Sequence, residues 1–206
     1  NGFKAYWNDG GQVLPPHDKG IIEEFEKIKD PQDIRISDSL NDILIEEIEE
    51  EIDEAYSKTL TSLQCQPARD HKHGGELGIV YSSLHGSGST LLPTLFKQWG
   101  FTNLLLVENQ CIPDGNFPTV SSPNPEDKEA LSLGINEMIS KNKDILLATD
   151  PDADRVGVVV KHKDAIHILN GNQIAALLAD HVFSQCQDTE NGACLKSIVT
   201  TELYRK

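Results

Sequence analysis

The stretch "LLATDPDADRVGVVV", residues 146–160, places three aspartates at alternate positions between two runs of apolar residues. Both runs are rich in residues that favour strands. Pro151 cannot sit in a central strand, and the small Ala153 lets the backbone bend. The stretch therefore predicts a strand, an acidic turn and a second strand.

The three carboxylates, those of Asp150, Asp152 and Asp154, indicate a divalent-cation site. In an extended chain Asp150 and Asp154 would lie about 13 Å apart, whereas the oxygens around Mg²⁺ lie about 2.1 Å from the ion. Convergence on one ion therefore requires the backbone to curl. Without an ion, carboxylates about 5 Å apart repel by about 3 kcal/mol per pair at an effective dielectric constant of 20, or by under about 1 kcal/mol if they are well hydrated.

Three alternatives bear on this loop. A solvated acidic turn without an ion stays open. An EF-hand is excluded, because its sixth and twelfth positions should be Gly and Glu and are Arg155 and Lys161 here. A phosphatase of the haloacid dehalogenase type, with Asp150 as nucleophile, also stays open, although Asp154 stands where that motif has Thr or Val.

Outward from the acidic loop, strand and helix patterns alternate, which is typical of an α/β fold with a mixed, largely parallel sheet flanked by helices. Residues 3–14 predict a hairpin and 65–76 a polar loop, in which His71 and His73 have a chelating spacing but no third ligand nearby. Strands are predicted at 77–83, 103–109, 144–150, 155–162, 165–169 and 196–204, and helices at 18–29, 40–60, 90–99, 125–141 and 172–185.

Composition excludes several classes of protein. The formal net charge of the 206 residues is -15, so a nucleic-acid backbone would be repelled. No apolar run suits a bilayer span or a signal peptide. The four cysteines have no C-x-x-C spacing, which favours free thiols in a reducing cytoplasm. The sequence does not predict an oligomeric state.

Five stretches, in order along the chain, carry a resemblance to a known family. They are "NGFKAYWNDGGQVLPPHD" (1–18), "VYSSLHGSGSTLLPTLFKQWGF" (80–101), "PDGNFPTVSSPNPEDKEAL" (113–131), "TDPDADRVGV" (149–158) and "LNGNQIAALLADHV" (169–182). Together they resemble the α-D-phosphohexomutase superfamily of phosphoglucomutases and phosphomannomutases. The residues of the third and fourth stretches are most similar to those of the type-2 phosphoglucomutase and phosphopentomutase branch.

The resemblance implies a four-domain enzyme around a cleft. On that template residues 1–36 are the end of the first domain, residues 37–168 the second domain with its metal loop, and residues 169–206 the start of the third. The serine loop of the family, T-x-S-H-N-P, would lie just upstream of Asn1. We therefore expect this chain to be a central fragment that is inactive alone.

The resemblance also implies a chemistry in which a phosphoserine donates its phosphoryl group to a sugar phosphate and recovers one from a bisphosphate. Asp150, Asp152 and Asp154 match the Mg²⁺ ligands, Arg155 matches a neighbouring phosphate-binding arginine, and Lys4 matches an acid–base lysine. Glucose 1-phosphate and glucose 6-phosphate are the expected substrates, with phosphopentomutase or phosphomannomutase activity as alternatives. A non-enzymatic, acidic metal-binding module is the alternative from another class. In "HGSGST", Ser87 is expected to be structural rather than catalytic.

Overall fold

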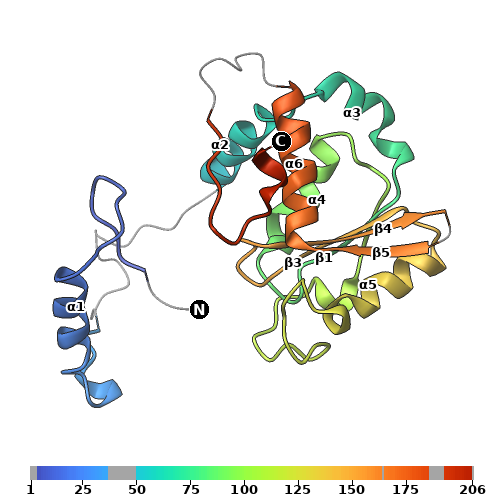
Figure 1. Cartoon of the computed structure of the whole chain (residues 1–206). Coiled ribbons are helices and arrows are strands. Elements are labelled where there is room, and N and C mark those ends of the chain that lie inside the picture. Colours follow the sequence, from blue (N-terminus) through green and yellow to red (C-terminus); the bar gives the residue numbers. More distant parts are fainter. Residues whose placement is uncertain (1–3, 37–49, 164, 186–192, 206) are drawn as a thin grey trace. The chain divides into compact units, whose positions relative to one another are not determined.

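The computed structural model describes residues 4–36, 50–163, 165–185 and 193–205. The chain forms two compact units, Asn1–Ile48 and Glu49–Lys206 (Figure 1). Short 3₁₀ turns lie at Pro31–Asp33, Gly74–Glu76, Glu108–Gln110 and Glu202–Arg205. The helices are α1 (His17–Phe25), α2 (Glu50–Thr61), α3 (Pro67–His73), α4 (Gly88–Gln98), α5 (Lys128–Ser140) and α6 (Gly171–Gln185), and the strands are β1 (Ile79–Ser82), β2 (Leu104–Leu106), β3 (Ile145–Thr149), β4 (Val156–His162) and β5 (Ala165–Leu169).

The first unit contains the predicted turn and the predicted helix. The Trp7 N–H donates to the carbonyl of Gly11 at 2.9 Å, and Gly10 adopts the positive φ of 82° that the turn requires. Tyr6 and Gln12 form a single bridge, so the hairpin is confirmed as a tight turn without extended strands. Helix α1 confirms the predicted helix but ends at Phe25, one turn before the expected end.

The second unit is built on a five-stranded sheet in the order β2-β1-β3-β4-β5. Strand β1 pairs in parallel with β2 and β3, so that Ile79 lies opposite both Leu104 and Ile145. Strand β4 is antiparallel to β3 and to β5, with Val156 opposite Thr149. The predicted mixed sheet is confirmed, with two of its four strand pairings parallel and two antiparallel rather than most of them parallel. The acidic loop is the connection between β3 and β4.

Helices cover both faces of this sheet, since α4 and α5 lie on opposite sides of it (Figure 1). Alternate residues of β1 point to the two sides. Val80 is in the core with Leu131 and Met138 of α5, whereas the ring of Tyr81 packs against that of Phe96 on α4, with the centroids 5.9 Å apart. The fully buried core also includes Leu146, Ala148 and Val159.

The prediction of a polar loop at 65–76 is wrong, because the first part of this segment forms helix α3 and the second part forms a 3₁₀ turn. Pro67 occupies the first turn of α3, where a proline is favourable, and the basic residues of the last turn complement the helix dipole. His71 and His73 are two positions apart on a helix and so do not face each other. The His73 ring lies beside Glu76 instead, with Nδ1 3.0 Å from Oε1.

The strand predicted at 196–204 is also wrong, because the chain turns there and ends in a 3₁₀ turn at Glu202–Arg205. No strand in the described part of the chain pairs with this segment, and a strand without a partner is not stable. The side chains of Ile198 and Val199 are 98% and 82% exposed. The Thr201 N–H donates to Asn172 Oδ1 at 2.9 Å.

The helix predicted at 40–60 is confirmed from Glu50 onward by α2, while residues 40–49 lie outside the described part. Across the described ranges, no helix combines the length and the apolar character that crossing a membrane requires.

Candidate functional site

The acidic loop follows β3 and brings three carboxylates together. One oxygen from each of Asp150, Asp152 and Asp154 lies within 4.8 Å of the others. The backbone curls because Ala153 takes a positive φ of 57° and its N–H donates to the carbonyl of Asp150 at 3.0 Å. The predicted convergence of the three side chains is confirmed; the binding of an ion by them stays a prediction.

Asp150 differs from the other two because it is fully buried, whereas Asp152 and Asp154 are exposed. Its Oδ1 accepts the backbone N–H of Arg155 at 3.0 Å, and its Oδ2 accepts the Arg155 Nε–H at 2.7 Å. Burial alone would raise the pKa of Asp150, but the hydrogen bonds and positive charge of Arg155 outweigh it and hold the pKa below its ordinary value. Asp150 is therefore ionised at neutral pH.

Asp154 experiences the opposite balance. The negative charge of Asp152, followed by partial desolvation of the carboxylate and the charge of Asp150, raises the pKa of Asp154 above its ordinary value. Arg155 Nε lies 3.7 Å from Asp154 Oδ1 and only partly offsets this repulsion. A second positive charge at the loop, such as a divalent cation, would favour the ionised form of all three groups.

The environment of Asp150 does not favour the phosphatase alternative. A carboxylate nucleophile needs an oxygen that a substrate can approach. Both oxygens of Asp150 are buried and accept hydrogen bonds from Arg155. A small cation is a different case, because each oxygen accepts one hydrogen bond from Arg155 and can offer a further lone pair, and one of them lies within 4.8 Å of an oxygen of Asp152 and of Asp154.

A buried hydrogen bond joins two strands of the sheet next to this loop. The hydroxyls of Tyr81 on β1 and Thr149 on β3 are 2.8 Å apart, and Thr149 immediately precedes Asp150. A Cβ at Gly88 would lie 2.3 Å from the Tyr81 hydroxyl, so only glycine lets α4 begin this close to the sheet. The start of α4 is thereby held against the base of the acidic loop.

Tyr81 provides a measurable prediction, because burial raises its pKa to about 12 from 10.0. Above about pH 10 the unfolded chain loses a proton that the folded chain keeps, so the free energy of unfolding should decrease as the pH rises toward about 12. Urea unfolding across this range measures the effect. Tyr81→Phe should lack this part of the decrease, and an identical decrease in the variant would contradict the assignment.

The glycine-rich loop before α4 contacts the acidic loop directly. Both the N–H and the hydroxyl of Ser87 donate to the carbonyl of Pro151, at 2.9 Å and 3.1 Å. The hydroxyl is therefore engaged with the backbone between two of the three aspartates. This contact agrees with a structural part for Ser87.

Lys4 lies in the first unit, Asn1–Ile48, where it is exposed and borders a hollow with Val13 and Phe25. The three aspartates belong to the second unit. The acid–base role of Lys4 stays a prediction.

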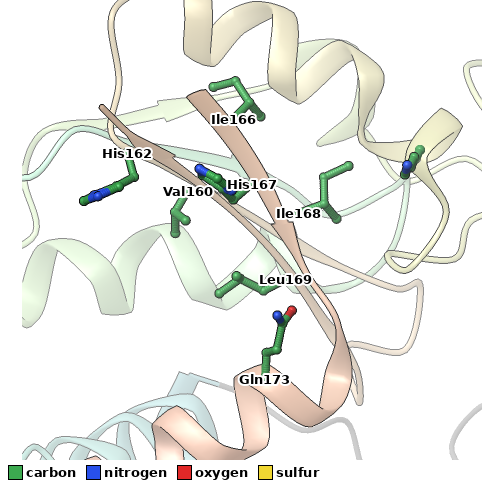
Figure 2. A pocket seen from close by; sticks show the side chains of 8 residues that line it. Val160, His162, Ile166, His167, Ile168, Leu169 and Gln173 are labelled. Atoms are coloured by element: carbon green, nitrogen blue, oxygen red, sulfur yellow. The ribbon is translucent and has the colours of Figure 1, made fainter. Parts of the chain in front are cut away.

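A second concave region, drawn in Figure 2, follows β4, β5 and the start of α6. Its ionisable side chains are Lys128, His162 and His167, and none of the three aspartates lines it. The two imidazole rings lie 6.4 Å apart between centroids on neighbouring strands. His162 ends β4, whereas the acidic loop precedes its first residue, so the histidines and the carboxylates form separate features.

A family model and several known proteins are similar to this chain. Residues 54–163 match the family model described as phosphoglucomutase/phosphomannomutase, alpha/beta/alpha domain II. This range includes the sheet as far as β4 and the whole acidic loop. A solved structure of a phosphoglucomutase/phosphomannomutase family protein from Burkholderia thailandensis is 34% identical, covering 53% of this chain and 22% of that chain with a TM-score of 0.45.

Two curated relatives extend the similarity to nearly the full chain. A phosphomannomutase of Mycoplasmoides pirum is 33% identical over 205 residues, which is 98% of this chain and 37% of the relative. A phosphoglucomutase of Staphylococcus aureus (strain MRSA252) is 33% identical over 207 residues, which is 100% of this chain and 37% of the relative. This chain thus spans a little over a third of the length of these relatives. It belongs to the phosphoglucomutase/phosphomannomutase family.

Proposed function

We propose that this chain is part of a sugar-phosphate mutase that interconverts glucose 1-phosphate and glucose 6-phosphate. Asp150, Asp152 and Asp154 hold its Mg²⁺. The observation that carries the proposal is the convergence of these carboxylates at the end of β3, inside the region that matches the family model. Ligands commonly bind at this edge of an α/β sheet.

The chemistry of the three side chains fits Mg²⁺. Carboxylate oxygens are the hard donors that this ion prefers, and Mg²⁺ keeps part of its coordination sphere for water or phosphate. An oxygen separation within 4.8 Å is close to the span of about 4 Å that opposite oxygens of an octahedral Mg²⁺ site have. When bound, the ion would neutralise negative charge on the phosphoryl group during its transfer.

Arg155 has two tasks in this proposal. Its Nε and backbone N–H fix the carboxylate of Asp150 and so orient the first ligand. Within the described ranges, no hydrogen bond involves its two terminal nitrogens, and the side chain is 57% exposed. The fixed fork of donors can therefore contact phosphate oxygens beside the metal site.

The wider assignment follows the family template. Residues 1–36 end the first domain, residues 37–168 form the second and residues 169–206 begin the third, in a cytoplasmic enzyme. Lys4 is the acid–base residue. Similarity to both a phosphoglucomutase and a phosphomannomutase leaves mannose phosphate as the first alternative substrate, with pentose phosphate as the second.

Phosphorus NMR tests the proposed activity. This chain and the product of the complete gene are each incubated with Mg²⁺, a catalytic sugar bisphosphate and the 1-phosphate of glucose, mannose or ribose. The 206 residues contain no T-x-S-H-N-P sequence, so we expect turnover only by the complete product and fastest with glucose 1-phosphate. No turnover of any of these sugars by the complete product would overturn the proposal.

A further inference from the structure

The acidic loop is held from behind by the turn that follows β1. A Cβ at Gly86 would lie 2.2 Å from Cα of Pro151, so the two backbones are in direct contact and position 86 accepts only glycine. Ser87 donates two hydrogen bonds to the carbonyl of the same proline. Pro151 lies between Asp150 and Asp152, so the position of this turn sets where the first two carboxylates lie.

The turn has an unfavourable backbone conformation that needs external support. Leu84 and His85 are consecutive residues with φ values of 45° and 65°, in the left-handed region of the backbone that residues other than glycine rarely adopt. Such conformations persist where surrounding contacts impose them, and they cluster at functional sites. His85 supplies several of these contacts, because its N–H donates to the carbonyl of Gln110 at 2.7 Å and its carbonyl accepts the N–H of Asp114 at 3.1 Å.

The ring of His85 completes the support. The ring is buried, and Nδ1 lies 3.1 Å from the carbonyl of Ile112, which can only accept, so Nδ1 carries the proton. Nε2 then accepts the hydroxyl proton of Thr119 at 2.7 Å. The amide of Gln110 donates to the same hydroxyl oxygen at 3.2 Å.

We infer that His85 is a positioning residue for the metal site: its ring ties the turn at 84–87 to the segment 110–119, and that turn fixes the acidic loop through Pro151. The inference rests on the proposed Mg²⁺ site and goes beyond it, since His85 itself touches neither the ion nor a substrate. Loosening the ring should lower metal affinity while the fold persists. Partners that hydrogen-bond metal ligands directly typically change metal affinity by about 10- to 100-fold. His85 acts through the turn and Pro151 instead, so we expect an effect at the lower end of this range.

Two variants separate this role from simple structural support. Thr119→Val removes the hydroxyl that binds Nε2 and keeps the side chain's shape, and His85→Asn removes the ring but keeps a residue that tolerates positive φ. Thr94→Val, on the exposed surface of α4, is the matched control. Electron paramagnetic resonance of Mn²⁺, with Mg²⁺ as competitor, measures affinity, while circular dichroism and urea unfolding establish that each protein is folded.

We expect Thr119→Val and His85→Asn to bind Mn²⁺ about 10-fold more weakly than the parent protein, the lower end of the range for partners of metal ligands, and Thr94→Val to bind it unchanged. If His85→Asn does not fold, Thr119→Val decides. Folded variants that bind Mn²⁺ as tightly as the parent, even with reduced stability, would overturn the inference and leave the proposed function standing. If the parent protein binds no Mn²⁺, or if Asp152 takes no part in the binding, both this inference and the proposed Mg²⁺ site are overturned.

Discussion

Replacing Asp152 with asparagine should lower the proposed mutase activity of the complete protein by about 10²- to 10³-fold, the loss that follows removal of one preorganised hydrogen-bond donor from a transition-state site. The change removes the charge of one of the three proposed ligands at constant size. Asp152 is exposed, so the free energy of unfolding should change by no more than about 0.5 kcal/mol. Its charge is the main cause of the raised pKa of Asp154, so without metal the variant relieves repulsion in the loop.

The control for this experiment is Asp53→Asn, which removes a carboxylate from the surface of α2, away from the acidic loop in sequence. Activity is measured with glucose 1-phosphate at saturating Mg²⁺, and Mn²⁺ binding is measured alongside. We expect Asp53→Asn to retain the parent's activity and affinity. Equal turnover by Asp152→Asn and the parent would show that the acidic loop does not hold the ion that the reaction uses.

The acidic loop and its sheet could be predicted from the sequence because their determinants are local. Strand-forming residues on both sides of Pro151 define β3 and β4, and the turn between them has few conformations available. The three aspartates occupy alternate positions of one short loop. The small residue Ala153, which lies between the last two, takes the positive φ that brings the carboxylates together. The residues of this stretch were sufficient to predict that the three carboxylates converge.

The support behind the loop could not be predicted in the same way, because it depends on contacts between distant segments. His85 and Thr119 are 34 positions apart, and neither lies in a pattern that indicates a partner. The nearest signal in the sequence was the glycine-rich stretch "HGSGST" at residues 85–90, whose Ser-Gly pair indicates a turn but not the residues that the turn contacts. Strand patterning likewise failed at 196–204, since a strand also needs a neighbouring edge, which no local pattern specifies.

The close contact between β3 and α5 predicts large changes in the free energy of unfolding when its residues are replaced. Leu146 is fully buried in β3, and a Cβ at Gly134 of α5 would lie 2.6 Å from its Cδ1, so the helix approaches the strand closely only because position 134 is glycine. Leu146→Ala should lower the free energy of unfolding by about 2–5 kcal/mol, through lost burial and the cavity that remains. Gly134→Ala should lower it by about 1–3 kcal/mol through overpacking, offset by up to about 1 kcal/mol from the better helix propensity of alanine.

The double variant distinguishes this packing from two independent effects. With Leu146 shortened, the methyl group at position 134 no longer meets Cδ1 and instead occupies part of the space that the leucine leaves. The double variant should therefore be more stable than the sum of the single changes predicts, with a coupling energy of about 0.5–3 kcal/mol, as measured for residues in contact. Urea unfolding of the four proteins measures it, and additivity within about 0.5 kcal/mol would mean that α5 can move away from β3 at little cost. Because β3 ends at Thr149 and leads directly into the acidic loop, the same four proteins compared for Mn²⁺ affinity would reveal whether packing beneath the strand reaches the carboxylates.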